Sequence, residues 1–376
     1  MRYILITDIQ YRKAFDVISI IKKQFPDENF LLCSDKARIV SWLCYGKCQI
    51  ERLRTEDGWE CFQEDFGLIL KKYSSDELIY IPVEEQTTDY IIKFLAINGR
   101  GNITAMLPST NLYNTFRNKK ALNKYCLTRG FPAPKQYNVD ELPNVDFPVI
   151  LKPEVGSGSH GIQRLYGPQD YTDAIKHILS KQDYLVQELL SHGKDVRGAF
   201  FLCHEGNVVG AYTHKRIRTS PEEGGVTVLS QKDDNPRLIQ QGKELLEHAG
   251  WEGLIMLEYI YDERCDQYKL IEANPRLWGS IMLSEYCGAN LLSNYIRICL
   301  GLPVNTTGIR EEAYIRWLFP MDIVNWFKKK GKVKDFWNFQ NTCFINWTYA
   351  RKDRALFFLM FSVFNMDNIR KLLKRS

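Results

Sequence analysis

The feature that most constrains the fold is an apolar run at the start of the chain that does not alternate with polar residues. Residues 3–6 read Tyr-Ile-Leu-Ile, so a strand over 2–7 would have both faces buried. Such strands belong to parallel sheets covered by helices. A helix is expected over 15–25, with further strands over 30–33 and 78–83. This alternation predicts an open α/β sheet with right-handed crossovers.

The turn after the first strand, residues 8–12, contains no glycine. A dinucleotide-binding fingerprint needs glycines there, so we interpret the first region as a substrate or scaffold domain. A boundary is expected within 99–110. A chain of 376 residues suits two or three domains.

The middle of the chain has a different pattern. A helix over 118–129 is ended by Gly130, and Pro-containing residues 131–134 then force an extended segment. The strands expected after it fall at 146–152, 184–189, 200–213 (a hairpin turning at Glu205 and Gly206), and 254–261 with 267–274 as a second hairpin.

Composition excludes several classes of protein. The net charge of +5 is small for this length and does not indicate nucleic-acid binding. The ten cysteines form no C-x-x-C pair, and even Cys44 and Cys48 are interpreted as ordinary buried thiols. Neither a signal peptide nor a membrane-spanning apolar stretch is recognised, which predicts a cytoplasmic location.

Two segments carry candidate chemistry. An apolar strand delivers Lys152 to its end, and a glycine-rich turn over 156–161 follows, where backbone N–H groups could approach phosphate oxygens. In the second hairpin, Glu272 and Asn274 share one face, and Glu258 on the partner strand can lie beside them. Three oxygen donors on one face suit Mg²⁺ bound together with nucleotide phosphates.

Together these segments resemble the ATP-grasp ligase superfamily over roughly residues 111–301. The resemblance implies an ATP-grasp fold, in which two α+β subdomains grip ATP, preceded by a Rossmann-like pre-ATP-grasp domain. The expected domains are 1–110 (pre-ATP-grasp), 111–305 (ATP-grasp, with a lid subdomain over about 125–190) and 306–376 (a basic, aromatic extension).

The resemblance also implies roles for individual residues. The two phosphate-binding lysines would be Lys119 and Lys152. Metal would be held by Glu258, Glu272 and Asn274, and Arg276 would contact the transferring phosphoryl group. The remaining nucleotide contacts would come from the lid residues Gly156, Ser157, Gly158, Ser159, His160 and Gly161, from the adenine-reading hinge Gln187, Glu188 and Leu189, and from Asp195, where the family usually has Glu for the ribose.

The reaction implied is that of an ADP-forming carboxylate–amine ligase using ATP and Mg²⁺, or Mn²⁺ in its place. Phosphorylation converts a carboxylate into an acyl phosphate, which an amine then attacks, and cations neutralise the transferring phosphoryl group. Lys215 and Arg218, in a basic stretch before a Gly-Gly pair, are predicted to face the acid or the phosphates. An exposed, charged strand end is the alternative.

Two other functions stay open: a carboxylase or carbamoyl-phosphate-type enzyme that uses bicarbonate, and an ATP-binding protein without turnover. Residues 311–376 contain 13 Lys/Arg and 6 Asp/Glu, and they hold half of the tryptophans of the chain. Peripheral membrane contact through this tail and packing on the core are both consistent with that pattern. Partners are therefore small carboxylates and amines, and a homodimer is an expectation from the family.

Overall fold

The computed structural model describes residues 1–35, 48–138, 145–156, 161–170, 184–190, 196–220, 226–305, 308–318 and 322–344. By internal contacts the chain divides into two compact units, each made of separate chain segments. Unit 1 comprises Met1–Leu107, Arg276–Thr307 and the chain from Cys343 on. Unit 2 comprises Pro108–Pro275 and Gly308–Thr342.

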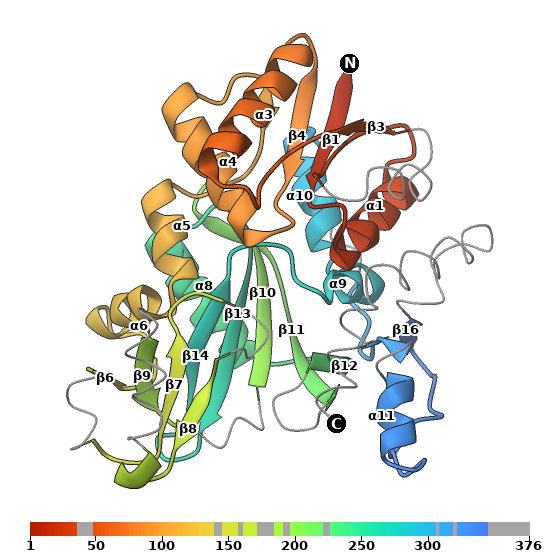
Figure 1. Cartoon of the computed structure of the whole chain (residues 1–376). Helices are drawn as coiled ribbons and strands as arrows, with labels where there is room; N and C mark the ends of the chain where they lie inside the picture. Colours follow the sequence, from red (N-terminus) through yellow and green to blue (C-terminus); the bar gives the residue numbers. More distant parts are fainter. Residues whose placement is uncertain are drawn as a thin grey trace. The chain divides into compact units, whose positions relative to one another are not determined.

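Unit 1 is built on a parallel sheet of five described strands in the order β3-β2-β1-β4-β5 (Figure 1). The central strand β1 pairs in parallel with β2 and with β4. Residues 4–6 are fully buried, which explains the unbroken apolar run. The strands are β1 (Arg2–Thr7), β2 (Asn29–Cys33), β3 (Gln49–Glu51), β4 (Glu77–Ile81) and β5 (Ile103–Thr104).

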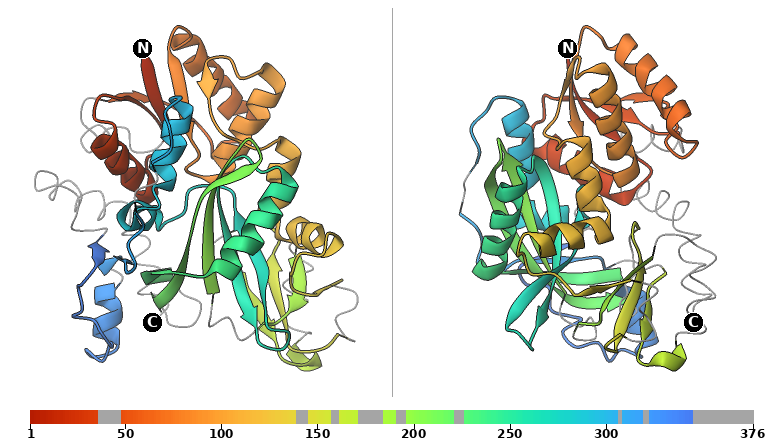
Figure 2. Two further views of the ribbon diagram at one scale, coloured as in Figure 1. Left: turned by 180° about the vertical axis from the view of Figure 1, so that it is seen from behind. Right: turned by 90° about the vertical axis from the view of Figure 1, so that its left-hand side faces the viewer.

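Helices cover both faces of this sheet. Helices α3 and α4 pack against each other on one face, while α1 packs with α9 and α10 on the other (Figure 2). The apolar side chains facing the sheet include Phe62 and Phe66, whose rings stack 5.3 Å apart. The bounds are α1 (Arg12–Gln24), α3 (Trp59–Lys72), α4 (Glu85–Asn98), α9 (Ile281–Cys287) and α10 (Leu291–Cys299).

Unit 2 contains most of a larger antiparallel sheet, which in the described part of the chain runs β14-β13-β10-β11-β12-β15-β16. Its long hairpin turns at Glu205 and Gly206, both with positive φ (53° and 74°), which matches the turn expected at these residues. The strands are β10 (Val196–His204), β11 (Asn207–Ser220), β12 (Val226–Asp233), β13 (Gly253–Asp262), β14 (Gln267–Asn274), β15 (Tyr314–Arg316) and β16 (Thr342–Phe344).

A smaller sheet of unit 2, in the order β6-β9-β7-β8, surrounds a compact apolar cluster of Val149, Leu151, Leu165 and Val186. Helix α6 begins where the Asn118 side chain accepts a hydrogen bond from the Ala121 N–H. The remaining bounds are β6 (Gln136–Tyr137), β7 (Val149–Pro153), β8 (Gln163–Leu165), β9 (Tyr184–Glu188), α5 (Thr110–Arg117), α6 (Lys119–Thr128), α8 (Pro236–Ala249) and α11 (Ile323–Lys328).

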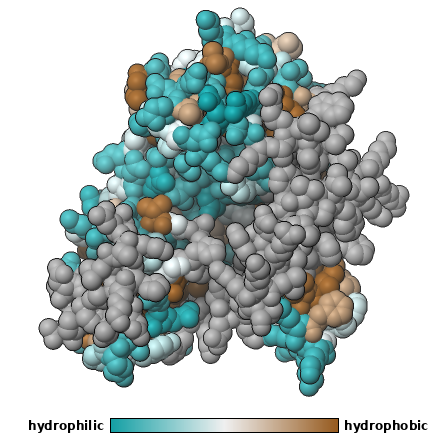
Figure 3. Space-filling model, viewed as in Figure 1, coloured by the Kyte–Doolittle hydropathy of each residue, from teal (hydrophilic) through white to brown (hydrophobic). Residues whose placement is uncertain are grey.

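The region after β15 exposes apolar side chains. Figure 3 shows them gathered over α11 and the turn after it, and the exposed large apolar residues of this stretch are Phe327, Trp337 and Phe339. Within the described part of the chain, no helix has the length and apolar character needed to cross a membrane. Membrane contact of the tail stays a prediction, because residues 345–376 lie outside the described residues.

Candidate active site

The acidic hairpin β13–β14 places the expected carboxylates side by side. Glu258 is the direct cross-strand partner of Glu272, and Met256 is the partner of Asn274. The side chains of Glu258 and Glu272 are only 12% and 21% exposed, and Asn274 is buried. Since Glu272 and Asn274 are two residues apart on one strand, these three oxygen-bearing side chains share a face of the sheet.

Two lysines converge on the same hairpin from different elements of unit 2. Lys119, at the start of α6, has its Nζ 3.7 Å from Glu272 Oε2, and Nζ donates a 2.6 Å hydrogen bond to the Gly156 carbonyl. Lys152, at the end of β7, donates from Nζ to the Ile271 carbonyl at 3.1 Å. Both lysines are buried. Charged amines this far from solvent need nearby anions.

The electrostatics of Lys152 reflect this position. Burial lowers the pKa of Lys152 to about 8, with Lys119 acting in the same direction, while Glu272 and Glu258 oppose the shift. The cause is the loss of water around an ammonium group, which the two carboxylates only partly replace. An additional anion beside these lysines, such as a phosphate, would therefore be favoured by the charges already present.

The glycine-rich turn after β7 is described only at its ends. Gly156 (φ 137°) and Gly161 (φ 76°) both adopt backbone angles that side chains disfavour. A Cβ on Gly161 would also lie 3.0 Å from Pro153 Cγ. The predicted lid residues Ser157, Gly158, Ser159 and His160 lie outside the described residues, as does the predicted ribose contact Asp195.

The expected hinge coincides with the end of β9. Gln187 is almost fully buried, and its backbone pairs with Ile150 on β7. The Glu188 N–H donates to the Lys135 carbonyl and the Leu189 N–H to the Pro148 carbonyl, each at 3.0 Å. These backbone donors are therefore engaged within the smaller sheet and its connections.

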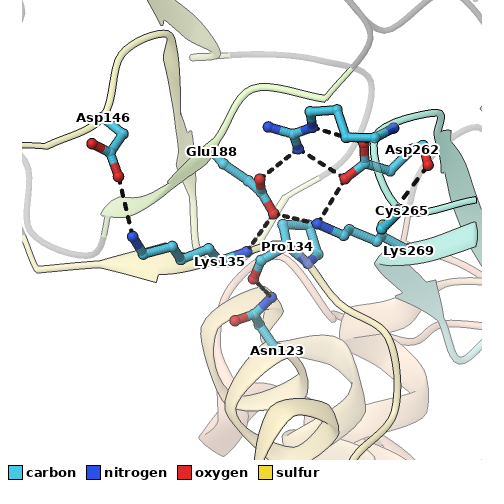
Figure 4. A network of polar contacts seen from close by, with 9 residues as sticks. Asn123, Pro134, Lys135, Asp146, Glu188, Asp262, Cys265 and Lys269 are labelled. Carbon is cyan, nitrogen blue, oxygen red and sulfur yellow. Dashed lines mark hydrogen bonds and ion pairs between the residues drawn. The ribbon is translucent and has the colours of Figure 1, made fainter. Parts of the chain in front are cut away.

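The Glu188 side chain is the centre of a charged network (Figure 4). It accepts from the Lys135 N–H at 2.8 Å, from Lys269 Nζ at 2.7 Å and from Arg264 Nη2 at 2.6 Å. Lys269 and Arg264 also bind Asp262. Burial alone would raise the pKa of Glu188, but these hydrogen bonds outweigh it and leave the pKa below its usual value. The network ties the end of β9 to the β13–β14 hairpin.

The basic residues of β11 divide differently from the sequence expectation. Arg216 Nη2 lies 2.6 Å from Glu258 Oε1, which places a guanidinium at the acidic hairpin. Lys215 precedes it by one residue and faces the opposite side of the strand. A bulge at Ile217 follows, and Arg218 forms a two-bond pair with the buried Asp322. The sequence analysis selected Lys215 and Arg218 and missed Arg216. The partners that distinguish Arg216 from Arg218 lie far along the chain, so the local sequence gives no sign of them.

Arg276 follows β14 by two residues and belongs to unit 1. Its Nη1 donates to the Leu277 carbonyl at 3.0 Å, and its Nε lies 4.0 Å from Glu85 Oε2. Its expected contact with a phosphoryl group stays a prediction.

The donor set suits a hard divalent cation held jointly with a nucleotide. Among the described residues there is no group of three His, Cys, Asp or Glu side chains placed to hold a metal alone. Two opposed glutamates with one amide supply only oxygen donors, which is the chemistry of Mg²⁺ sites completed by phosphates and water. The residues present therefore fit Mg²⁺ with ATP better than a self-sufficient metal site.

Comparisons with known proteins agree with this arrangement. Residues 201–318 match the family described as "ATP-grasp in the biosynthetic pathway with Ter operon". The biotin carboxylase–βγ-ATP complex of Campylobacter jejuni aligns over 83% of this chain and 74% of that one, with 16% identity and a TM-score of 0.66. The L-amino acid ligase of Bacillus licheniformis aligns over 80% and 74%, with 12% identity and a TM-score of 0.60.

The curated relatives are much longer than this chain. Acetyl-CoA carboxylase 2 of Oryza sativa subsp. japonica is 22% identical over 169 residues, which cover 43% of this chain and 7% of the relative. The chain thus matches less than a tenth of the length of that protein. Such likeness concerns the fold rather than the whole protein's activity.

The chain therefore has the ATP-grasp fold, and its residues 201–318 match an ATP-grasp family. The fold class expected from the sequence is confirmed, with an N-terminal parallel α/β region and antiparallel sheets after it. The domain limits 1–110, 111–305 and 306–376 stay predictions. The compact units group the segments differently, because residues 276–307 pack within unit 1 and residues 308–342 within unit 2.

Proposed function

We propose that the chain is an ATP- and Mg²⁺-dependent carboxylate–amine ligase that forms an acyl phosphate and releases ADP and phosphate. The observation that carries the proposal is the convergence of Lys119 and Lys152 on the acidic face of Glu258 and Glu272 within one compact unit. Four charged side chains from four separate elements are gathered there with little exposure to solvent, which is typical of a site that binds a charged ligand.

Glu258, Glu272 and Asn274 would hold Mg²⁺, which supplies charge neutralisation on the phosphates when bound. The lysines would bind the phosphate oxygens directly, Lys119 from the N-terminus of α6 and Lys152 from the end of β7. Their burial supports this role, because each ammonium acts more strongly where little water screens it.

Arg216 joins Lys215 and Arg218 as a candidate for binding the acid, and its position favours it. Its guanidinium already contacts Glu258, and a planar fork of N–H donors suits a carboxylate or an acyl phosphate. Arg218 is committed to Asp322, whose side chain is fully buried. Arg218 would then act by holding the strand end rather than by touching the substrate.

A bicarbonate-using carboxylase is the second candidate, and the similarity to biotin carboxylase structures favours it. Both reactions begin with phosphorylation of a carboxylate by ATP, so the site described above serves either. They differ in the acid that is phosphorylated and in the nucleophile that follows.

The deciding experiment measures ADP and AMP release by the full-length chain with Mg²⁺ and ATP over a matrix of carboxylic acids and amines, with bicarbonate as one of the acids. Hydroxylamine is included in parallel, since it converts an acyl phosphate into a detectable hydroxamate. The proposal expects ADP release that requires an organic acid, and hydroxamate formation with that acid.

Release of AMP would contradict the acyl-phosphate route. ADP release that depends on bicarbonate alone would favour the carboxylase. Binding of Mg·ADP without turnover under every combination would favour an ATP-binding protein that lacks catalysis.

A further inference from the structure

The parallel sheet of unit 1 has a point where the strand order reverses direction. The chain passes from β1 outward to β2 and β3, then returns to place β4 on the other side of β1. In open α/β sheets, ligands bind beyond the carboxyl ends of the strands that flank such a reversal. Asp8 follows β1 directly, and shortly after β4 Glu84 is the N-cap residue of α4, which begins at Glu85.

The buried carboxylate of Asp8 has few hydrogen-bond partners among the described residues. Its side chain is 7% exposed, and Oδ1 accepts a 2.9 Å hydrogen bond from Thr87 Oγ1. Oδ2 makes no hydrogen bond of normal geometry to any residue that the structure describes. A buried carboxylate oxygen without a partner is costly in a folded protein, so this oxygen requires a separate explanation.

The charged side chains around Asp8 do not balance the negative charge of its carboxylate. Lys13 Nζ pairs with Glu84 Oε1 at 2.9 Å and also donates to the Leu277 carbonyl at 3.3 Å. Burial raises the pKa of Asp8 to about 6 and Glu84 adds to the shift, although the hydroxyls of Thr7 and Thr87 and, more weakly, the charge of Lys13 oppose it. Among the described residues, Asp8, Glu84 and Glu85 are three carboxylates against the two cations Lys13 and Arg276, an excess of one negative charge.

The missing partner is therefore a cation that can donate hydrogen bonds. A divalent metal is a poor candidate, because Lys13 lies within the cluster, and no metal-holding group is found among the described residues. A primary ammonium group fits better, since it carries one charge and three N–H donors in a small volume. Glu84, 23% exposed, gives the cluster an edge open to solvent.

We propose that Asp8 and Glu84 form a subsite that binds the ammonium group of a small-molecule substrate, with Asp8 Oδ2 as its buried acceptor. The inference rests on the proposed ligase function, in which an amine is one of the two substrates. The ammonium could belong to the amine that is joined or to an amino acid used as the acid. The chemistry recognised at Asp8 is the same in both cases.

The test measures binding to the full-length chain by calorimetry and thermal shift, without turnover. The probes are methylammonium and the common amino acids, each compared with a form that lacks N–H donors or charge: tetramethylammonium for the first and the N-acetyl derivatives for the others. Decarboxylated amines paired with their parent amino acids show whether a carboxylate is recognised as well, which separates the two sources of the ammonium.

We expect ammonium-bearing probes to bind the wild-type chain and the blocked forms not to bind. Asp8→Asn should weaken binding by at least about tenfold, because a neutral amide cannot pair with a cation. Glu84→Gln should weaken binding less. The matched control is Glu77→Gln, since Glu77 begins the same strand β4 at its opposite end and pairs with Arg2 at the surface. It should bind as the wild type does.

Equal binding by Asp8→Asn and wild type would overturn the subsite, as would equal binding of the blocked probes or failure of every probe. Binding of Mg·ADP is measured on the same samples. Wild-type chain that binds Mg·ADP but no ammonium compound would refute the subsite and leave the proposed function standing. Wild-type chain that binds ammonium compounds but not Mg·ADP would refute the proposed function and support the subsite.

Discussion

Arg216 Nη2 and Glu258 Oε1 lie 2.6 Å apart, so the guanidinium holds one of the two carboxylates that we propose for Mg²⁺. The two side chains come from β11 and β13, which are separated in the sheet by β10. When Mg²⁺ binds to Glu258, the carboxylate is shared between the metal and the guanidinium of Arg216, so its contact with Arg216 must weaken. Arg216 would then be released toward the anionic substrate as Mg·ATP binds.

Replacing Arg216 by Met should strengthen Mg²⁺ binding and weaken turnover. Removal of the guanidinium ends its competition for Glu258, and an ion pair that is partly exposed contributes up to about 1 kcal/mol, so the gain in Mg²⁺ affinity should be a few-fold. The acid loses a partner, so its KM should rise. Mg²⁺ titrations in the presence of ADP, and KM for the acid, are the measurements.

The control for this variant is Arg237→Met. Arg237 also pairs with a carboxylate of unit 2, that of Asp266 in the turn of the acidic hairpin, but both of these side chains are more than half exposed (57% and 72%). It should leave Mg²⁺ affinity unchanged. If Arg216→Met weakened Mg²⁺ binding instead, the guanidinium would be supporting the carboxylate rather than competing for it.

Glu272→Gln should abolish most of the activity while the chain stays folded. The amide keeps the shape of the side chain but removes the charge that faces both Glu258 and Lys119. We expect kcat to fall on the order of 10²-fold or more, with a higher Mg²⁺ requirement. The same change at the exposed Glu263, in the turn of the same hairpin, should have no effect on either quantity. A fully active Glu272→Gln enzyme would rule out the proposed metal site.

Local patterns of the sequence were sufficient for much of this fold. The apolar run of β1 and the period-two pattern of β14 predicted a buried parallel strand and the shared face of Glu272 and Asn274, since both depend on neighbours within one element. The strand expected over 146–152 is shorter at its start, as β7 begins at Val149. Sequence pattern alone places such boundaries poorly, because backbone pairing partners lie elsewhere in the chain.

Contacts between distant segments account for the rest. Nothing near Arg216 in the sequence distinguishes it from Lys215 or Arg218. Only the register of β11 and the bulge at Ile217 decide which guanidinium meets Glu258. Glu188 was expected to face a base, and its role beside Arg264 and Lys269 also depends on a strand more than seventy residues away. Such pairings follow from topology and carry no local signal.

Lys269→Met should destabilise the chain and weaken ATP binding. Glu188 and Asp262 would each lose a cation in a largely buried network, which we expect to cost about 1–3 kcal/mol of unfolding free energy. Because the pKa values of both acids are lowered in the folded chain, the stability they contribute is present at neutral pH and is lost as the pH falls through those values. The deficit of the variant should therefore shrink in acid.

Lys135→Met is the matched control for this network. Lys135 contacts Glu188 through its backbone N–H, whereas its side chain is 60% exposed, pairs with the surface residue Asp146 and lies over the Tyr137 ring. Denaturant unfolding should find it unchanged. A loss equal to that of Lys269→Met would show that the connecting segment, and not the buried ion pairs, fixes the end of β9.

Asp8→Asn should stabilise the chain at neutral pH, the opposite of what removal of a structural carboxylate would do. Burial and Glu84 raise the pKa of Asp8 from 3.8 to about 6, against the weaker pull of Lys13 and the hydroxyls of Thr7 and Thr87. A carboxyl group with a raised pKa favours folding below its unfolded value and loses that contribution as the pH rises to about 6. Above that pH, the unfavourable free energy that the substitution by Asn removes is up to about 3 kcal/mol.

Urea unfolding from pH 4 to 7.5 should show the stability advantage of the variant growing between pH 4 and 6 and then levelling. An advantage that is independent of pH, or a loss of stability at neutral pH, would mean that Asp8 is already satisfied within the folded chain.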